Sequence, residues 1–274
     1  MDIRGDGLVI GGGSGIGRAC ALALAREGAA GVMIADINAE AANKVALEAR
    51  IANPDMHVEA AEVDVTSEQS IDQLLQRYTH AFRRLDYFIN CAGIGVQKAA
   101  QVAEADAAEF RRFMDINVTG TLLATRAASA IMMAQDPLPV TQRVEGALPR
   151  GDTRGVIVLM GSASSFVSTP GMVQYTTSKH AVLGIAKNSA LDNAVHNIRV
   201  NSVCPSWVDT PMVRQAIDTV PGLEKMIENA VPMRRMATPE EIADAVMFLC
   251  SPRSSFITGC GLVIDGGTTL TSKV

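Results

Sequence analysis

The sequence predicts a single α/β domain, a doubly wound, seven-stranded parallel sheet with helices on both faces. Three observations support this fold class. The length of 274 residues suits one large domain, and 48% hydrophobic against 19% charged residues provide enough apolar material for a buried core. Short apolar runs alternate along the chain with longer helical patterns. No internal repeat and no Gly/Ser-rich or Pro-rich linker divides residues 1–274 into smaller units.

Most of the expected strands are continuous apolar runs rather than alternations of apolar and polar residues. Strands buried on both faces have this character, as in a parallel sheet that is covered by helices. The seven runs are 8–10, 31–35, 58–63, 86–91, 156–160, 199–203 and 261–264.

The segments between these runs show helical patterns, and several have recognisable start signals. Ser67 and Thr238 each provide a capping hydroxyl before acidic residues of an expected first turn, and Pro239 stands at the first helical position. The expected helices are 15–27, 39–52, 67–83, 109–134, 175–195 and 239–250.

Two segments do not fit this alternation. Residues 135–154 contain three prolines, two glycines and six charges, so we expect an exposed loop there, which is long for a compact domain. Residues 206–236 are rich in methionine and other apolar residues, as expected of a flexible flap over a substrate pocket. An ordinary pair of amphipathic helices packed on the core is the alternative for this second segment.

Composition and charge argue against several classes of function. The net charge is -5 and the acidic residues are spread along the chain, so no nucleic-acid partner is expected. The most apolar stretch, 119–134, is interrupted by Arg126, so no membrane span is expected either. The first apolar run is four residues long and ends in glycines, which is not the core of a signal peptide.

The cysteines and histidines favour neither a disulfide framework nor a metal site. The five cysteines are widely separated and form no C-x-x-C, and the four histidines do not cluster. We therefore expect a reducing, cytoplasmic compartment and no metal ion.

A glycine-rich turn follows the first expected strand and opens the first expected helix. Its register is G-x-x-x-G-x-G, at Gly11, Gly15 and Gly17. The register G-x-G-x-x-G is excluded by Ile16 and Cys20, and the residues after Gly17 exclude a P-loop. Backbone amides at a helix N-terminus attract anions, and glycine lets a pyrophosphate approach the backbone. The turn therefore predicts a dinucleotide site.

Asp36 closes the second expected strand, 19 residues after Gly17. A carboxylate at this point can accept hydrogen bonds from the two hydroxyls of an adenosine ribose, whereas a 2′-phosphate would face a like charge. Ile37 and Asn38 provide no compensating cation, and neither does Gly13. NAD is therefore favoured over NADP, and the alternative for Asp36 is a helix cap or a turn residue.

Tyr175 and Lys179 are four residues apart in an expected helix, so both lie on one face. An ammonium near a phenol favours the phenolate and lowers the tyrosine pKa, which suits proton exchange with an alcohol or a ketone. Ser162 follows the expected strand 156–160, at the strand end where ligands of open α/β sheets bind. Its hydroxyl could bond the same substrate oxygen.

Taken together and in order, these motifs resemble the short-chain dehydrogenase/reductase family, from residue 8 to residue 267. The resemblance implies a Rossmann-type fold. The motifs that carry it are the glycine turn, Asp64-Val65, Asn90-Cys91-Ala92-Gly93, Asp115-Ile116-Asn117-Val118, Ser162, Tyr175-x-x-x-Lys179, Pro205 through Thr210, and Ile264-Asp265-Gly266-Gly267.

The resemblance implies four catalytic residues. Tyr175 would be the general acid/base, and Ser162 would orient and polarise the reacting oxygen. Lys179 would hold the nicotinamide ribose and depress the pKa of the tyrosine. Asn117 would hold a water that extends the proton relay to solvent, although a polar residue that merely kinks the helix is the alternative.

The same resemblance assigns the cofactor contacts. Asp64 would bond the adenine amino group beside Val65. Val208 and Thr210 would hold the carboxamide of the nicotinamide. The complete expected set is Gly11, Ser14, Gly15, Ile16, Gly17, Asp36, Asp64, Val65, Asn90, Ala92, Gly93, Tyr175, Lys179, Val208 and Thr210.

The chain departs from the family pattern at a few positions. Ile10 stands where the family has Thr, so a hydrogen bond that stabilises the turn is lost. Cys91 replaces the second Asn of N-N-A-G, and Ser206 replaces a Gly. Ser164 and Ser165 are alternative hydroxyls, but their spacing to the tyrosine matches the family less well. The reacting groups themselves are all present.

These observations predict an NAD(H)-dependent oxidoreductase that interconverts a secondary alcohol and a ketone, with a small hydrophobic molecule as substrate. An NADP-dependent carbonyl reductase is one alternative, and a non-catalytic NAD-binding regulator or scaffold is another. Small residues along 109–134 and 175–195 further suggest a homodimer or homotetramer, unless they serve packing onto the sheet. They are Thr119, Gly120, Ala124, Ala127, Ala128, Ala181, Gly184, Ala186 and Ala190.

Overall fold

The computed structural model describes residues 2–96, 98–140, 146 and 148–271, and it confirms the predicted fold class. Seven parallel strands form one sheet in the order β3-β2-β1-β4-β7-β8-β9. Their bounds are β1 Asp6–Ile10, β2 Gly31–Asp36, β3 His57–Glu62, β4 Tyr87–Asn90, β7 Gly155–Met160, β8 Ile198–Pro205 and β9 Gly261–Ile264. The strand order reverses between β1 and β4, and ligands of open α/β sheets bind at such a switch point.

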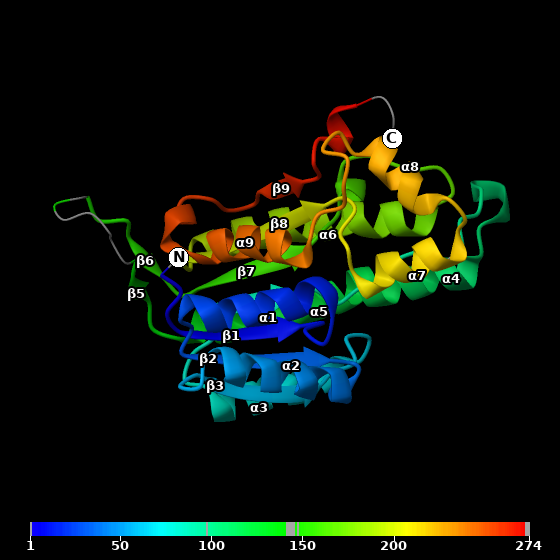
Figure 1. Cartoon of the computed structure of the whole chain (residues 1–274). Helices are drawn as coiled ribbons and strands as arrows, with labels where there is room; N and C mark the ends of the chain where they lie inside the picture. Colours follow the sequence, from blue (N-terminus) through cyan, green and yellow to red (C-terminus); the bar gives the residue numbers. More distant parts are fainter. Residues whose placement is uncertain (1, 97, 141–145, 147, 272–274) are drawn as a thin grey trace.

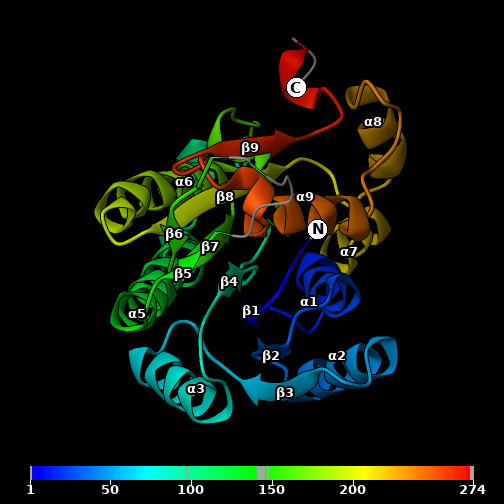
Figure 2. The ribbon, with the colours of Figure 1, turned by 90° about the vertical axis from the view of Figure 1, so that its left-hand side faces the viewer.

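Helices cover both faces of the sheet, as Figure 2 shows in a view along it. On one face lie α1 (Gly15–Glu27), α2 (Ala39–Ala52) and α9 (Pro239–Cys250). On the other lie α3 (Glu68–Ala81), α5 (Gly120–Ala134) and α6 (Val173–Ala194). Short 3-10 helices span Val102–Glu104, Ala163–Ser165, Pro252–Ser254 and Thr268–Leu270. Within the ranges given above, no helix has the length and apolar content needed to cross a bilayer.

The core is divided into two apolar clusters, and every strand of the sheet except the edge strand β9 contributes buried residues to both. Leu8 and Ile10 belong to the cluster beneath α3, α5 and α6, whereas Val9 belongs to the one beneath α1, α2 and α9. Because successive strand residues point to opposite faces, both faces must be apolar. This requirement explains the continuous apolar runs in the sequence.

The predicted helix 109–134 is interrupted in the structure. Residues Ala107–Phe113 form α4, Met114–Thr119 form a π-helical turn, and α5 follows. A π turn holds one residue more than an α turn and occurs mostly at functional sites. Apolar periodicity cannot reveal such a break, because both flanking helices keep an apolar face.

The predicted loop 135–154 contains a short hairpin. Leu138–Pro139 (β5) pairs antiparallel with Asp152–Thr153 (β6), and residues 141–145 and 147 lie outside the described residues. The hairpin lies near the N-terminus of the chain, at the opposite end of the molecule from α4 and α7 (Figure 1). It is therefore remote from the carboxyl ends of the strands.

Residues 206–236 form a pair of amphipathic helices, α7 (Pro211–Thr219) and α8 (Leu223–Ala230), so the helix-pair alternative is correct for the secondary structure. The pair is only lightly packed on the core, because every residue of α7 is at least partly exposed and Ile227 is the buried residue of α8. Figure 1 shows α7 at the end of the molecule opposite the β5–β6 hairpin. The segment can therefore border a site there.

Candidate active site

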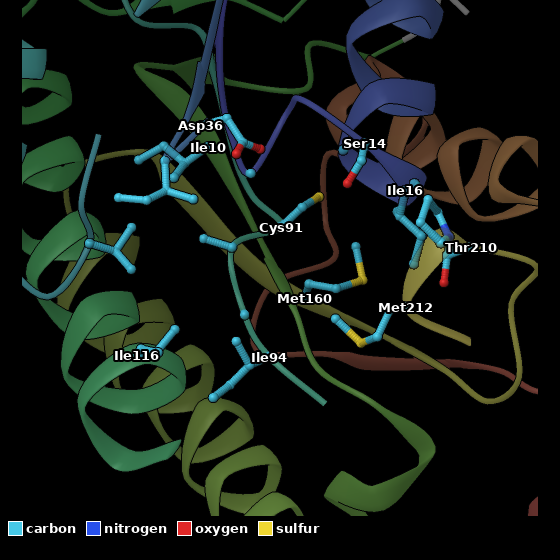
Figure 3. A pocket seen from close by; sticks show the side chains of 18 of the residues that line it. Ile10, Ser14, Ile16, Asp36, Cys91, Ile94, Ile116, Met160, Thr210 and Met212 are labelled. Carbon is cyan, nitrogen blue, oxygen red and sulfur yellow. The ribbon is translucent and has the colours of Figure 1, made fainter. Parts of the chain in front are cut away.

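A cavity of about 570 Å³ opens at the carboxyl ends of the strands, near the switch point of the sheet. This cavity, called the main pocket below, is within the size range of small-molecule and cofactor sites. Its walls come from the β1–α1 turn, from the ends of β2, β4, β7 and β8, and from α6 and α7. In Figure 3, Asp36 marks one end of it, and Ile94 and Met212 lie toward the other.

The glycine turn forms a tight cradle on one wall. Gly11 has a φ of 73°, and a Cβ added there would lie 2.6 Å from the backbone nitrogen of Ala92. A Cβ on Gly17 would lie 2.0 Å from the carbonyl oxygen of Gly11, so neither position accepts a side chain.

The first turn of α1 adds to this cradle. It carries no acidic residue, and within the described residues no side-chain cap from Ser14 satisfies its amides. These features fit the anionic pyrophosphate of a dinucleotide, because free amides and the helix dipole both attract negative charge.

Asp36 lines the main pocket at the end of β2. Its Oδ2 accepts a hydrogen bond from the backbone N–H of Gly13 (2.9 Å), and its Oδ1 accepts one from the N–H of Asn38 (3.0 Å). The alternative role for Asp36 is a helix cap or a turn residue. The helix cap is wrong, because Asn38 caps α2 through the N–H of Ala41, whereas the bond from Asn38 to Asp36 is a turn contact. Each carboxylate oxygen keeps further acceptor capacity for a ribose hydroxyl.

Within the described part of the pocket wall, no basic side chain balances the carboxylate of Asp36. Arg18, the basic residue that follows the glycine turn, forms an ion pair with Glu48 on α2. Among the described residues that line the main pocket, Lys179 is the single cation, and it lies on α6. No lysine or arginine lining this pocket is therefore available beside Asp36 to balance a 2′-phosphate.

Two other strand ends, those of β3 and β4, contribute to the pocket wall. Asp64, Val65, Ala92 and Gly93 line it as expected. Asn90 does not, which corrects the expectation that it lines the channel. Its side chain is buried, its Oδ1 accepts from the N–H of Ala92 (3.1 Å), and its amide faces Thr121 at 3.4 Å. Asn90 therefore shapes the turn after β4 from behind the wall.

Tyr175, Lys179 and Ser162 converge beside the main pocket. Tyr175 and Lys179 line it, and the ammonium of Lys179 lies 5.7 Å from the centroid of the phenol ring. The same ammonium donates to the carbonyl oxygen of Met160 (2.8 Å). Ser162 is buried at the start of the turn after β7, with its side chain within hydrogen-bonding reach of Tyr175.

The pKa of Tyr175 differs from the sequence-based expectation. Burial raises the pKa of Tyr175, Cys204 raises it further, and the hydrogen bond with Ser162 opposes this rise. Burial also lowers the pKa of Lys179 to about 8. The pKa of Tyr175 in the protein alone is therefore raised and not lowered as expected, because removing the phenol from water outweighs the hydrogen bond with Ser162.

Asn117 fastens the π turn to its surroundings. Its Oδ1 accepts from the N–H of Ile94 (2.8 Å), and its Nδ2 donates to the carbonyl of Ile94 (3.1 Å) and to the hydroxyl of Ser178 (3.0 Å). Ser178 in turn donates to the backbone carbonyl of Tyr175 (2.8 Å). The side chain of Asn117 thus connects the loop after β4 to the helix that carries the tyrosine. Its role in holding a relay water stays a prediction.

The structure brings together nearly all of the predicted site residues. Those lining the main pocket are Gly11, Ser14, Gly15, Ile16, Gly17, Asp36, Asp64, Val65, Ala92, Gly93, Tyr175, Lys179, Val208 and Thr210. Ser162, Asn90 and Asn117 lie buried behind this wall.

Sequence reasoning did not assign a role to several residues that the site uses. Ile94 lines the main pocket from the loop after β4, Met160 lines it as the last residue of β7, and Met212 lines it from α7. Their positions near strand ends and at the start of the segment 206–236 could have indicated that they border the pocket. Ser178 is a buried hydroxyl that joins site residues, and no pattern in the sequence distinguishes it from other serines. Ser165, which the sequence offered only as an alternative to Ser162, is a second buried hydroxyl of this kind.

The chain is similar to known proteins over nearly its whole length. A family model described as "Enoyl-(Acyl carrier protein) reductase" matches residues 11–269. A relative from Neurospora crassa, "Short-chain dehydrogenase srdC", is 55% identical over 276 residues that cover 100% of both chains. A relative from Sphingobium indicum, "2,5-dichloro-2,5-cyclohexadiene-1,4-diol dehydrogenase", is 36% identical over 98% of both chains.

Solved structures are similar over the same extent. The 3-ketoacyl-(acyl-carrier-protein) reductase from Brucella melitensis, solved in complex with NADH, superimposes with a TM-score of 0.81 at 29% identity. The match covers 96% of this chain and 98% of that chain.

Proposed function

The chain belongs to the short-chain dehydrogenase/reductase family of oxidoreductases, and on this premise we propose that it interconverts a secondary alcohol and a ketone with NAD(H). The observation that carries the proposal is the convergence of Tyr175, Ser162 and Lys179 on the main pocket, into which the N-terminus of α1 also opens. The phenol of Tyr175, the hydroxyl of Ser162 and the ammonium of Lys179 lie at the main pocket, which the glycine turn also lines. Proton exchange at a substrate oxygen needs this combination.

The preference for NAD(H) is supported by Asp36. Its carboxylate lines the main pocket at the end of β2, where a ribose with two free hydroxyls can donate to it. A 2′-phosphate at the same place would meet this carboxylate without a balancing cation among the described lining residues. The NADH complex of a similar structure is consistent with this choice.

In the proposed reaction, the substrate oxygen lies between the hydroxyls of Tyr175 and Ser162. A nicotinamide, when bound, would supply the acceptor or donor of the hydride at its C4. In alcohol oxidation, the alcohol proton passes to the phenolate oxygen of Tyr175 while Ser162 holds the reacting oxygen by a hydrogen bond. In ketone reduction, the phenol returns that proton to the oxygen. Overall, alcohol and NAD⁺ give ketone, NADH and one proton.

Lys179 has two roles in this proposal. Its ammonium is directed toward Met160 and the pocket, where a ribose hydroxyl could accept a further hydrogen bond. Its positive charge also stabilises the phenolate of Tyr175 when the proton has left. Burial raises the pKa of this phenol. An oxidised nicotinamide, when bound, would add a positive charge that lowers this pKa.

We infer a hydrophobic substrate from the walls at the tyrosine end. Ile94, Met160 and Met212 present aliphatic and thioether side chains to the main pocket (Figure 3). Thioether side chains adapt to irregular apolar surfaces. A relative that is named for dehydrogenation of a cyclohexadienediol makes cyclic secondary alcohols the first substrates to test.

The proposal is tested by following NADH formation at 340 nm with a panel of cyclic and aryl secondary alcohols, with NAD⁺ and NADP⁺ in parallel. We expect turnover with NAD⁺, and loss of at least about a hundredfold in Tyr175→Phe, because the acid/base group is removed. Binding of NADH to this variant, followed by fluorescence, should persist.

Tyr87→Phe is the matched control, since Tyr87 bonds Arg4 far from the pocket. Unchanged turnover in Tyr175→Phe would contradict the assignment of the acid/base. A clear preference for NADPH would instead contradict the role of Asp36 and favour the carbonyl-reductase alternative.

A further inference from the structure

Ser165 is a buried residue that contacts two residues of the proposed reaction, Ser162 and Lys179. It ends the short helix Ala163–Ser165, which follows β7 and begins after Ser162. Its side chain is 3% exposed, so its hydroxyl makes its bonds inside the protein. The reaction described above does not involve this hydroxyl directly.

Two hydrogen bonds join Ser165 to two different site residues. Its Oγ accepts from the backbone N–H of Ser162 (3.2 Å) and donates to the backbone carbonyl of Lys179 (2.8 Å). Lys179 also bonds the carbonyl of Met160 through its ammonium (2.8 Å). Lys179 is therefore tied to the turn 160–165 at both ends, by its backbone through Ser165 and by its side chain directly.

We propose that Ser165 is a positioning residue that holds the turn carrying Ser162 in register with the face of α6 that carries Tyr175 and Lys179. The inference rests on the proposed function, because it concerns the placement of the two hydroxyls around the reacting oxygen. The bond to Ser162 places one of them. The bond to Lys179 anchors that placement to the helix one turn after Tyr175.

A capping role alone does not account for these contacts. Ser165 and Ser162 form a capping box at the short helix, and this box requires only the bond to the N–H of Ser162. The bond to Lys179 spans 14 positions and reaches a carbonyl within α6, where helical carbonyls already accept from the N–H four residues on. The second bond therefore connects two elements rather than satisfying either of them.

Packing restricts the hydroxyl to this position. A Cβ on Gly161 would lie 3.1 Å from the Oγ of Ser165, 2.6 Å from the Oγ of Ser202 and 2.7 Å from the Sγ of Cys204. The backbone of Gly161 therefore approaches the Oγ of Ser165 closely, and because Ser165 is also buried, its hydroxyl has little room for another rotamer. The placement of Ser162 is thus sensitive to the loss of one oxygen atom.

The experiment titrates Tyr175 directly, without a substrate. The chain has three tyrosines, and burial raises the pKa of Tyr78 and Tyr87 well above the ordinary value. In the enzyme saturated with NAD⁺, the first rise in tyrosinate absorbance at 295 nm therefore reports Tyr175. The groups facing the phenol that also titrate are Lys179 and Cys204, and neither absorbs at this wavelength.

We expect Ser165→Ala to raise the pKa of Tyr175 by about half a unit to one unit, since Ser162 no longer stabilises the phenolate from a fixed position. Ser162→Ala should give a shift at least as large. Turnover at neutral pH should fall about tenfold in Ser165→Ala, while KM for NAD⁺ changes less than about threefold. Ser165→Cys, which keeps the size and a weak donor, should give an intermediate shift.

Ser164→Ala is the matched control, because Ser164 contributes its backbone N–H, and not its side chain, to the bonds of this turn. Far-UV circular dichroism at each pH verifies that the variants are folded, and Ser165→Cys is used if Ser165→Ala is not. An unchanged tyrosinate titration in a folded Ser165 variant overturns the proposal, as does an equal shift in Ser164→Ala. Turnover that survives in Tyr175→Phe would instead refute the proposed function, and this outcome is independent of the titration.

Discussion

The ammonium of Lys179 donates a hydrogen bond to the backbone carbonyl of Met160 over 2.8 Å, at the end of strand β7. This bond holds a buried cation against the strand end that leads into Ser162. Burial lowers the pKa of Lys179 to about 8, so the charge is kept at a cost in stability. Lys179 therefore lowers the stability of the fold while it provides the positive charge that the proposed reaction needs.

We predict that Lys179→Met stabilises the protein near pH 7 while abolishing turnover. A fall in pKa from 10.5 to about 8 corresponds to a folding cost of about 3 kcal/mol for the protonated lysine. Loss of the bond to Met160 offsets part of this gain, which leaves about 1–2 kcal/mol. Calorimetry of both proteins at pH 7 measures the difference.

The pH dependence of this difference gives the sharper test. Below about pH 8, Lys179 is protonated in both states and the whole cost is present. Between about pH 8 and 10.5 the unfolded state binds more protons, so the stability of the parent protein rises with pH relative to that of the variant. The advantage of Lys179→Met should therefore shrink from pH 8 to pH 10, and a constant difference would contradict the assigned pKa.

Gly95→Ala should weaken substrate binding at the tyrosine end of the main pocket. A Cβ on Gly95 would lie 2.7 Å from the Sδ of Met212, so the thioether must leave its place on the pocket wall. We expect KM for a hydrophobic alcohol to rise about fivefold, or ~1 kcal/mol, with kcat less affected.

The double variant Gly95→Ala/Met212→Ala removes this clash and should restore much of the loss. Gly184→Ala is the control, because a Cβ on Gly184 meets nothing within 4 Å. Additive effects in the double variant would show that the two residues do not act on each other.

Asp36→Ala should relax the choice of cofactor. Removing the carboxylate removes two acceptors for the ribose hydroxyls and the repulsion of a 2′-phosphate. We expect kcat/KM to fall about tenfold with NAD⁺ and to rise with NADP⁺. Glu62→Ala is a control of equal charge, since Glu62 pairs with Asp36 in register but is exposed on β3. Equal changes in both variants would indicate a general charge effect.

We predict that the protein is a homo-oligomer that uses the outer faces of α5 and α6. Five of the small residues on these helices are buried within the chain, so packing onto the sheet accounts for them: Gly120, Ala124, Ala128, Ala186 and Ala190. Apolar residues nevertheless face outward, with Leu122 50%, Leu191 75% and Val195 80% exposed. Light scattering after size exclusion should give a multiple of 28.9 kDa, and Leu191→Glu should reduce it. A monomeric parent protein would refute this prediction.

Most of the fold could be predicted because its signals are local. The bounds of α1, α2 and α9 agree with the predicted ranges, since capping residues and glycines mark their ends. The apolar runs locate all seven strands of the sheet, because a sheet covered on both faces requires them. The break at Met114–Thr119 could not be predicted, since it depends on how Asn117 meets the Ile94 loop in three dimensions.

The site was predicted where motifs contact the pocket directly and missed where residues act from behind it. Tyr175, Lys179 and Asp36 occupy the expected wall. The direction of the Tyr175 pKa was wrong, because burial is a property of the assembled fold and spacing along a helix does not report it. Ser165 was considered only as an alternative to Ser162, since its bonds depend on the path of the turn after β7.

The π-helical turn at Met114–Thr119 also sets the angular phase between the two helices on either side of it. One additional residue in a turn rotates everything beyond it by about 100° around the axis. With this offset, Phe113 before the turn and Ala124 beyond it are both directed into the protein interior. Deleting a single residue here would let the segment become one regular helix and swing one of these two sides outward. The extra residue therefore lets the segment pack into the core on both sides of the turn while Asn117 keeps its bonds to Ile94, and a regular helix would lose one of the two.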